Sequence, residues 1–422
     1  MARRPGALGL AFLLGLTCAA GIAVPVAAAG QEAGPPLAIV GGTLIAAPGA
    51  APIEDAVVVV EGGRIAAVGS RREVPVPEGA ETLDASGATV LAGFWNSHVH
   101  FADPGWMGAD TLPGDRLRAR LEAMLNRWGF TRVVDTGSFL ANTLALRRRI
   151  DAGELPGPAI LTAGVPFVPP GGTPFYLRPL VLPEIESAAA AADSAQVRLA
   201  AGADLIKVFA GSPVEPGALA VLMPGEALAA VVRAAHAAGR VVAAHPTSRE
   251  GAARAADAGV DLLLHTTPDE GGEWDPAFAR ELVERGVALA PTLDLWRWVL
   301  ERGGAPPDVS ERFQATAIGQ LAAFAAAGGR VVFGTDVGFT DAFDPTAEYR
   351  GMERAGLGFD AILAALTTVP AALFGLEERT GRIEPGLAAD LVLVEGDPRE
   401  DIAALARVRA TIVGGRIVYR NP

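Results

Sequence analysis

The feature that most constrains the fold is a regular alternation of short apolar runs and Ala- and Leu-rich stretches over residues 92–375. The runs have the length of buried strands, and the intervening segments, such as PGEALAAVVRAAHAAG, have the apolar spacing of amphipathic helices that end at glycine. The eight runs are FWNSHVH, TRVVDTG, PAILTAG, DLIKVFA, RVVAAHP, DLLLHTT, VALAPTL and RVVFGTD. Eight strand–helix units predict an α/β fold of the (β/α)8 TIM-like barrel type. A doubly wound open sheet is the alternative, but no GxGxxG follows the first run.

The two ends of the chain share a different pattern. Near the start, LAIVGGTLIAAPG, AVVVVEGGRIAAVGS and GATVLAG are β-rich runs interrupted by Gly, Pro and Asp. Near the end, GRIEPGLAADLVLVEGD and VRATIVGGRIVYR repeat this style. We therefore expect a small β-sandwich domain composed of residues 37–91 and 376–422, with the barrel occupying residues 92–375 between them.

The first residues predict an export signal that is not part of the fold. Arg3 and Arg4 precede an apolar run, and small residues follow up to Ala29. We expect cleavage after Ala29, removal of residues 1–29, and a periplasmic or secreted protein without stable membrane insertion. An uncleaved membrane anchor is the alternative, because residues 7–24 are nearly long enough to span a bilayer.

Composition limits the partners and the covalent crosslinks. Cys18 is the only cysteine and lies in the export segment, so the mature chain cannot form a disulfide. The preceding Thr17 fits a lipoprotein signal poorly, which argues against anchoring through Cys18. A net charge of −13 argues against a nucleic-acid partner, since phosphate binding needs a basic surface. The expected partner is a small-molecule substrate, and association into a homo-oligomer is left open.

Four of the five histidines lie where predicted strands end. The C-terminal ends of barrel strands converge on one mouth, so residues distant in sequence meet there. The convergent set is His98 and His100 from the first strand, Lys207 from the fourth, His245 from the fifth, His265 from the sixth and Asp336 from the eighth. Imidazoles and carboxylates without cysteine suit zinc or a similar divalent ion. The fifth histidine, His236, lies in a helical stretch and is expected to pack there.

Lys207 is unusual because it is the only lysine among 35 basic residues, leaving 34 arginines. A lysine amine can lose its proton and act as a nucleophile, whereas a guanidinium group stays charged. Lys207 also lies inside an apolar run, where a lysine needs a partner. The position therefore predicts covalent chemistry, with a chance surface lysine as the alternative.

The ordered set of motifs resembles the amidohydrolase superfamily of metal-dependent hydrolases, and within it the imidazolonepropionase-like branch that includes Xaa-Pro and Xaa-Arg dipeptidases. GATVLAGFWNSHVHF is similar to the superfamily's first-strand signature and GADLIKVFAG to its carboxylated-lysine strand. VVAAHPTS, VDLLLHTTP and VVFGTDVG are similar to its fifth, sixth and eighth strands, and ERTGRIEPGLAADLVLVEGDP to its returning β segment. The resemblance covers nearly the whole mature chain.

The resemblance implies two divalent ions, expected to be zinc, joined by a Lys207 side chain that carries an N6-carboxyl group. It assigns His98, His100, Lys207 and Asp336 to one ion, and Lys207, His245 and His265 to the other. Imidazolonepropionases themselves bind one metal without such a lysine, so Lys207 favours the dipeptidase-like relatives.

The implied reaction is hydrolysis of an amide or peptide C–N bond in a small substrate, such as a dipeptide or an N-acyl amino acid. A metal-bridging hydroxide would attack the carbonyl, with Asp336 as general base. Pure ligation by Asp336 remains an alternative. So do a lactone or phosphoester substrate on the same ions and a secreted binding protein without catalysis.

Specificity is expected from the loops after the strands. The loop after the third strand carries Tyr176 and Arg178, and the segment after the seventh carries Arg297 between Trp296 and Trp298. An arginine could clamp a substrate carboxylate through paired hydrogen bonds. The acidic residues that could meet a free amine are Asp269, Glu270 and Glu273. For each residue a plain surface position is the alternative.

Overall fold

A computed structural model describes residues 35–268 and 272–421. The predicted export signal with Cys18, and the loop residues Asp269 and Glu270, lie outside the described residues. Within the described part of the chain, no helix is both long and apolar enough to cross a membrane.

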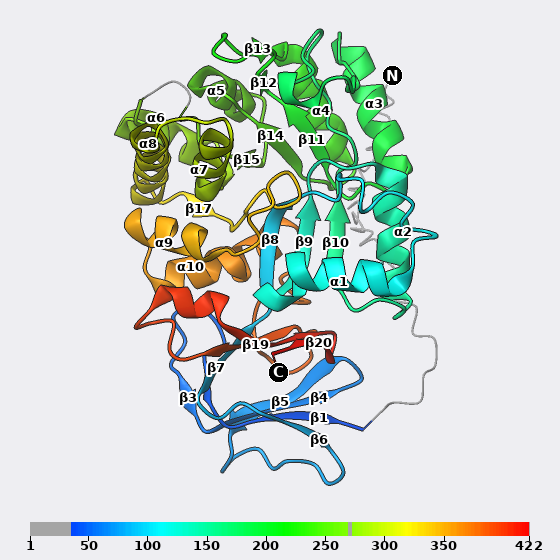
Figure 1. The fold of residues 1–422 in the computed structure, drawn as a ribbon, viewed down its shortest axis with the longest axis vertical. Helices are drawn as coiled ribbons and strands as arrows, with labels where there is room; N and C mark the ends of the chain where they lie inside the picture. The colour runs from blue at the N-terminus through cyan, green and yellow to red at the C-terminus, as the bar shows by residue number, and fades with distance from the viewer. Residues whose placement is uncertain (1–34, 269–271, 422) are drawn as a thin grey trace, which may run out of the picture. The chain divides into compact units, whose positions relative to one another are not determined.

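The eight strands predicted for the barrel are all present and parallel (Figure 1). They are β8 (Phe94–Val99), β9 (Phe130–Asp135), β10 (Ala159–Thr162), β11 (Ile206–Phe209), β14 (Val242–His245), β15 (Leu262–Leu264), β16 (Ala288–Ala290) and β17 (Arg330–Val331). They form two sheets with the strand orders β10-β9-β8 and β11-β14-β15-β16-β17. The result is an α/β arrangement of the TIM-like barrel type.

Isolated backbone pairs span the two gaps between these sheets. On one side the Phe167 amide donates to the Lys207 carbonyl at 3.0 Å, beyond the end of β10. On the other side the Asp336 amide donates to the His98 carbonyl at 2.9 Å, beyond the end of β17. The backbone of three predicted site residues therefore lies at the two places where the sheets approach each other.

Two strand positions differ from the sequence-based expectation. The eighth ladder ends at Val331 instead of reaching Asp336, because the Phe333 amide donates to Ala365 O in the last turn of a helix. Asp336 itself has a left-handed backbone with φ 61° and follows the strand. Lys207 is the second residue of β11, so it lies inside the strand and not at its end.

Helices follow the barrel strands along the chain. They are α1 (Gly114–Met124), α2 (Leu140–Asp151), α3 (Ala188–Ala200), α4 (Gly225–Ala237), α5 (Arg249–Asp257), α6 (Pro276–Glu284), α7 (Leu293–Arg302), α8 (Pro307–Ala326), α9 (Thr346–Arg354), α10 (Phe359–Leu366) and α11 (Thr368–Leu373). Side chains cap several of them in the way their sequences predict. Ser187 accepts from the Ala190 amide at the start of α3, and Asp275 accepts from the Phe278 amide at the start of α6.

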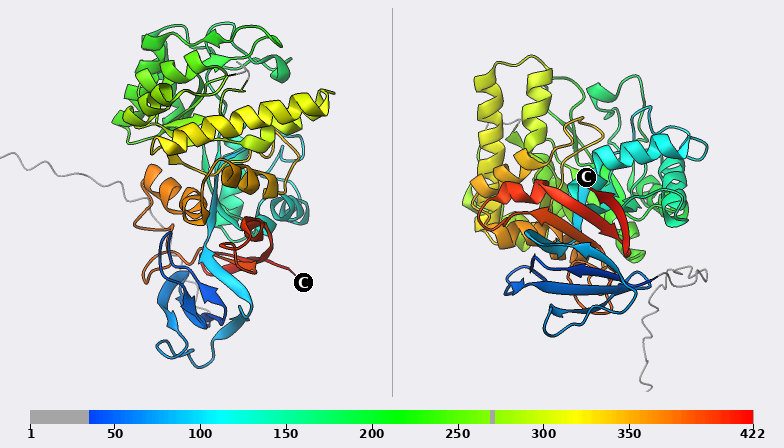
Figure 2. Two further views of the ribbon diagram at one scale, coloured as in Figure 1. Left: turned by 90° about the vertical axis from the view of Figure 1, so that its left-hand side faces the viewer. Right: turned by 60° about the horizontal axis from the view of Figure 1, so that its bottom comes forward.

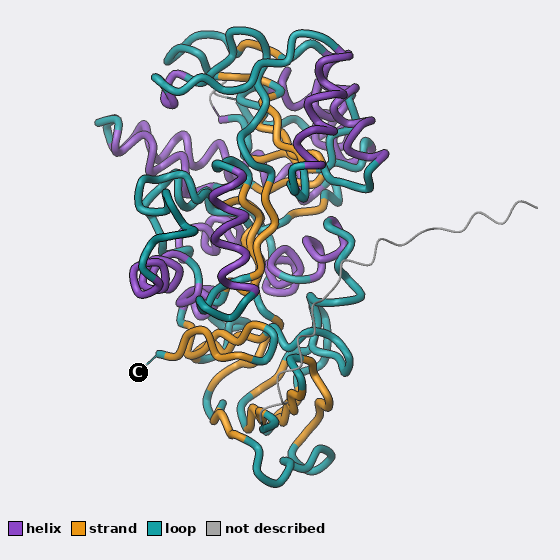
Figure 3. The backbone as a smooth tube through the Cα atoms, turned by 90° about the vertical axis from the view of Figure 1, so that its right-hand side faces the viewer, coloured by secondary structure: helices purple, strands orange, loops and turns teal. Residues whose placement is uncertain are grey.

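Strands from both ends of the chain share one sheet, as the colours of Figure 2 show, and Figure 3 shows that the part of the molecule near the C-terminus consists mainly of strands and loops. Its order is β20-β19-β18-β7-β2-β3, and a second sheet has the order β5-β4-β1-β6. The strands are β1 (Leu37–Val40), β2 (Thr43–Leu44), β3 (Ile53–Glu54), β4 (Ala56–Glu61), β5 (Arg64–Ser70), β6 (Glu81–Asp84), β7 (Ala88–Ala92), β18 (Leu391–Glu395), β19 (Val408–Val413) and β20 (Arg416–Arg420). We call them the chain-end sheets.

The chain-end sheets bury a common apolar cluster. It includes Ile39 and Val58 from the four-stranded sheet and Val90, Leu393 and Ile412 from the six-stranded one. β7 and β18 pair antiparallel, and β8 begins two residues after β7 ends. The first barrel strand is thus continuous with a strand held by the C-terminal segment, as Figure 2 shows on its left.

Candidate metal centre at the barrel mouth

The alternation of side chains along β11 places Lys207 inside the barrel. Ile206 and Val208 belong to the large core cluster, whereas Leu205 belongs to the separate cluster formed by inward-facing residues of the barrel strands. Because side chains on a strand alternate between faces, Lys207 points inward with Leu205. Its side chain is buried, and Nζ lies 5.4 Å from the centre of the Phe209 ring. Burial lowers the pKa of Lys207 to about 7, although Asp336 opposes the shift.

His98 lies in β8 and His100 directly follows its last residue, and the two-residue spacing turns both rings to the same side. Their Nε2 atoms are 3.2 Å apart. His100 Nδ1 lies 2.9 Å from the carbonyl oxygen of Gly137. Since a carbonyl only accepts, Nδ1 carries the hydrogen, and in the neutral ring the Nε2 lone pair faces His98.

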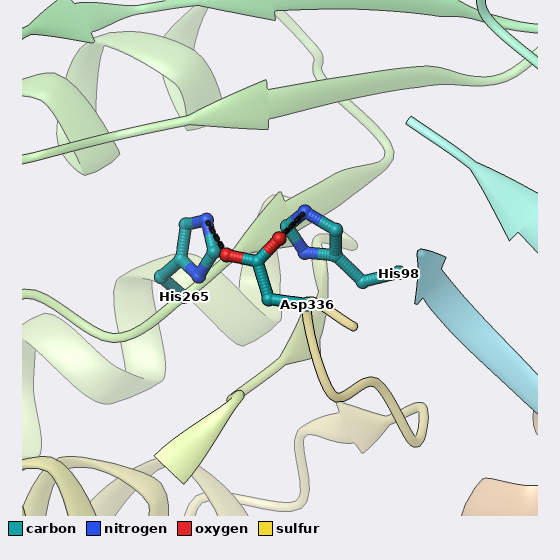
Figure 4. Close-up of side chains that lie close together, drawn as sticks. All are labelled: His98, His265 and Asp336. Carbon is teal, nitrogen blue, oxygen red and sulfur yellow. Dashed lines mark ion pairs between the residues drawn. The ribbon is translucent and has the colours of Figure 1, made fainter. Parts of the chain in front are cut away.

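Asp336 lies between the histidines of the first and sixth strands (Figure 4). Its Oδ1 is 2.8 Å from His100 Nε2 and 3.2 Å from His98 Nε2, and its Oδ2 is 4.0 Å from His265 Nε2. One ligand atom from each of His98, His265 and Asp336 falls within 4.8 Å of the others, and all three residues are buried.

His245 completes the cluster of rings. The centres of the His245 and His265 rings are 4.7 Å apart, as are those of His98 and His265. His245 also packs against Phe209, again with 4.7 Å between ring centres. The structure therefore brings together all four histidines, Lys207 and Asp336, as the sequence predicted for a barrel mouth.

Thr292 supports His265 from behind, and the sequence analysis did not identify it. His265 Nδ1 lies 2.6 Å from Thr292 Oγ1, and this hydroxyl donates to the Pro291 carbonyl at 2.8 Å. The hydroxyl has one hydrogen, so it accepts from His265 Nδ1. His265 Nε2 is then left with a free lone pair, the form that a metal ligand needs. The available signal was the position of Thr292 just after the seventh strand.

Backbone strain is concentrated at this site. Among the described residues, five that are not glycine have positive φ, and three of them are His265 (75°), Thr292 (48°) and Asp336 (61°). Such conformations cost free energy and persist where the surroundings enforce them, often at functional sites. Here each one turns a side chain at a strand end.

Electrostatics favour neutral rings in three of the four positions. Burial, with repulsion from neighbouring cationic groups, lowers the pKa of His98, His245 and His265 well below the usual value. For His100, burial also pulls the pKa down, but the contact with the Asp336 carboxylate outweighs it, so the pKa is raised. The Asp336 carboxylate therefore favours the protonated form of His100.

The donor set fits a cation. Asp336 Oδ1 is a buried oxygen without a hydrogen-bond partner among the described residues, although His98 Nε2 and His100 Nε2 lie 3.2 and 2.8 Å away. A buried carboxylate oxygen needs a partner, and a cation can supply it. A divalent ion among them would convert these contacts into ligation. Nitrogen and carboxylate donors without sulfur match zinc and similar ions.

Asp135 is a second residue that the sequence analysis missed. It ends β9, is fully buried, and accepts hydrogen bonds from Ser138, Thr143 and Thr162 hydroxyls at 2.6–3.0 Å. Burial raises its pKa, although these hydrogen bonds oppose the shift. Asp135 thus fixes the turn that presents the Gly137 carbonyl. A carboxylate at the end of a barrel strand was the signal for it.

The predicted substrate residues lie on the surrounding loops. The Tyr176 ring is 5.3 Å from the Phe339 ring, and Arg178 Nη2 donates to the Val214 carbonyl at 3.1 Å. Arg297 is paired with two carboxylates of its own helix, at 2.8 Å from Asp294 and 2.9 Å from Glu301. Arg297 would have to leave these partners to clamp a substrate.

Two further predicted residues differ in their surroundings. Trp296 is buried beside the cluster, with 6.2 Å between its ring centre and that of His265, whereas Glu273 is exposed. His236 lies on α4 outside the cluster, as expected, but its side chain is exposed and paired with Asp261 at 2.9 Å instead of packing in the core.

Comparisons with known proteins agree with this geometry. A sequence model of the amidohydrolase family matches residues 89–418. The chain is 27% identical to ochratoxinase of Aspergillus niger over 420 residues, covering 88% of this chain and 84% of the relative. A solved Xaa-Pro dipeptidase with methionine in its active site matches with a TM-score of 0.78 and 25% identity over 92% of this chain and all of the other. A prolidase complexed with N-methylphosphonate-L-proline matches with a TM-score of 0.75 and 27% identity, at the same coverage.

Proposed function

Because the chain belongs to the amidohydrolase family, we propose that it hydrolyses the amide bond of a small substrate, a dipeptide or an N-acyl amino acid, with two divalent ions. Family and relatives support hydrolysis of a C–N bond. The observation that carries the proposal is the convergence of four histidines, a lysine and an aspartate on one buried point. His98, His100, Lys207 and Asp336 would hold one ion, and Lys207, His245 and His265 the other.

Carboxylation of Lys207 is part of the proposal. An amine with a pKa of about 7 is neutral in a large fraction of molecules near neutral pH. The neutral Nζ attacks the carbon of CO2, so that a new N–C bond forms while the electron pair of one C=O π bond moves to oxygen, and the amine releases one proton to solvent. The product is a carbamate with one negative charge, whose two oxygens can face two cations. An arginine at this position cannot undergo this reaction.

Asp336 is proposed as the general base. When bound, the two ions would supply a hydroxide near neutral pH and polarise the substrate carbonyl. Asp336 Oδ1 contacts His98 and His100, whereas Oδ2 lies 4.0 Å from its nearest imidazole partner. Oδ2 is therefore the oxygen that takes a proton and passes it to the leaving nitrogen. Tyr176, Arg178 and Arg297 remain candidates for contact with the rest of the substrate.

The remaining sequence-based expectations are also proposals. We infer that the two barrel sheets act as one closed (β/α)8 barrel and that the chain-end sheets form one β-sandwich domain. The shared apolar cluster and the backbone pairs across the gaps support both. We also propose export to the periplasm or the medium with loss of residues 1–29, which N-terminal sequencing of the purified protein tests.

The activity is tested with a panel of dipeptides and N-acyl amino acids beside lactones and phosphoesters. Release of amino acids from the amide substrates, in a protein holding close to two zinc or similar ions per chain, supports the proposal. Turnover of lactones or phosphoesters alone assigns the site to that chemistry. A protein that neither holds metal nor turns over any of these substrates would contradict the proposal and favour the non-catalytic binding protein.

A further inference from the structure

Four aromatic side chains form a chain of ring contacts between three segments that follow barrel strands. Phe175 and Tyr176 follow β10, Trp298 lies on α7 after β16, and Phe339 follows β17. Ring centres are 5.3 Å apart for Phe175 and Tyr176, 5.3 Å for Tyr176 and Phe339, and 6.0 Å for Trp298 and Phe339. We call this set the aromatic rim. All three segments follow the C-terminal ends of barrel strands, the end at which the histidines converge.

The rim is tied to the proposed general base by the backbone. The amides of Phe339 and Thr340 donate to the carbonyl oxygen of Asp336 at 3.2 and 3.0 Å, which forms one tight turn. Phe339 therefore follows Asp336 by three residues in a segment with fixed geometry. A group resting on Phe339 lies close to a bond that reacts beside Asp336.

The rim leaves apolar surface open to solvent. Phe175 and Tyr176 are each 38% exposed and Phe339 is 37% exposed. Trp298, which packs against Phe339, is held in place by polar neighbours. Trp298 Nε1 donates to Asp341 at 2.7 Å, and the Arg302 guanidinium lies 4.9 Å from the Trp298 ring centre. Contiguous apolar surface of this kind commonly marks a ligand site.

We propose that the aromatic rim binds an aromatic or bulky apolar group of the substrate, so that the enzyme prefers amides carrying such a group beside the scissile bond. This rests on the proposed amide hydrolysis and adds the class of substrate. Aromatic rings from different loops can stack on a flat apolar group and exclude water from it. Phe339 would position the bound group relative to the scissile bond, because it lies in the same turn as Asp336.

The test uses four substrates: N-acetyl-L-alanine, N-acetyl-L-phenylalanine, N-benzoyl-L-alanine and N-benzoyl-L-phenylalanine. They vary each side of the amide bond separately. We expect kcat/KM of at least one aromatic substrate to exceed that of N-acetyl-L-alanine by about 10-fold or more, the scale of discrimination by apolar pockets. Phe339→Ala should reduce that ratio by about 10-fold. Val197→Ala, which shortens a 70% exposed side chain on α3, should leave the ratio unchanged.

Equal kcat/KM for all four substrates would overturn the inference while leaving the proposed hydrolysis intact. Failure to hydrolyse any of them removes support from the proposed hydrolysis instead. In that case the role of the rim is tested without turnover, by measuring the affinity of the Asp336→Asn enzyme for these compounds by calorimetry. N-benzoyl-L-phenylalanine should bind about 10-fold more tightly than N-acetyl-L-alanine, and Phe339→Ala should remove the difference; equal binding overturns the inference. An oligomer that Phe339→Ala converts to monomer in light scattering would show that a second copy covers the rim, which also overturns it.

Discussion

His265 Nδ1 and Thr292 Oγ1 meet at 2.6 Å, and the same hydroxyl donates to Pro291 O at 2.8 Å. The direction of the second hydrogen bond fixes that of the first, and hence the tautomer of His265. Thr292 directly precedes α7. The first turn of this helix is fixed from α9, because Glu348 accepts from the Asp294 amide at 2.9 Å. A residue outside the proposed ligand set thus sets the protonation state of a proposed metal ligand.

Thr292→Val should weaken metal binding at His265. Valine keeps the shape of threonine but removes the acceptor for Nδ1–H, and loss of such partners costs about 10–100-fold in metal affinity. Competition with a fluorescent chelator measures the change. Thr411→Val is the matched control. Thr411 lies in the chain-end sheets, and its buried hydroxyl also donates to a backbone carbonyl, that of Asn126, at 2.6 Å. Thr292→Ser should keep the wild-type affinity, and equal affinities in all three variants would contradict the role of Thr292.

Asp336→Asn should retain much of the metal and lose most turnover. An amide oxygen can still act as a ligand, and asparagine tolerates the positive φ of this position better than most residues. It cannot accept the proton, and loss of a general base costs about 10²–10⁴-fold in rate. Steady-state kinetics with elemental analysis of the same preparation test this. Turnover near the wild-type rate would place the base on another residue.

Lys207→Arg should abolish binding of two ions while the barrel stays folded, because guanidinium keeps the charge but cannot bond CO2. Lys207→Ala should also be inactive, yet acetate or propionate added with metal should restore part of the activity by occupying the space of the carbamate. Wild-type enzyme with the same additions is the control. A Lys207→Arg enzyme with two ions and normal turnover would refute the bridging role.

The metal-free protein should become more stable as pH rises through the alkaline range. The pKa of Lys207 is about 7 in the fold against an ordinary value of 10.5. Between these values the unfolded chain binds more protons, so the free energy of unfolding increases with pH from about 7 to about 10.5. Urea unfolding in chelator and CO2-free buffer at pH 7.5 and 9.5 measures the slope. Lys207→Met should be more stable at pH 7.5 and lack this component; identical slopes in both proteins would contradict it.

Much of this arrangement could be predicted from the sequence, because the spacing of apolar residues indicates which side chains of a strand or helix are buried. The eight runs became the eight strands, and the apolar run around Lys207 correctly indicated a buried side chain. The six residues that converge were recognisable because histidines and the only lysine of the chain occur in or just after the predicted strands, in the order of the family's motifs.

What the sequence could not indicate depends on contacts between distant segments. The eighth strand ends at Val331, and two residues later the Phe333 amide donates to the Ala365 carbonyl of a helix, which no local pattern reveals. Thr292 and Asp135 act through hydrogen bonds to partners up to 27 residues away. Threonine and aspartate are common at strand ends, so their type alone did not distinguish them from ordinary loop residues. The aromatic rim likewise exists only where three loops meet.

The pairing of β7 with β18 has a consequence for synthesis. A ribosome releases β7 and the first barrel strand long before it makes Leu391–Glu395, so the edge of β7 that β18 will occupy waits unpaired while the whole barrel segment emerges. An open strand edge readily pairs with another chain. The segment from β18 onward therefore covers the edge of β7 only at the end of synthesis. A nascent chain that stops before β18 keeps this strand edge unpaired and prone to aggregation.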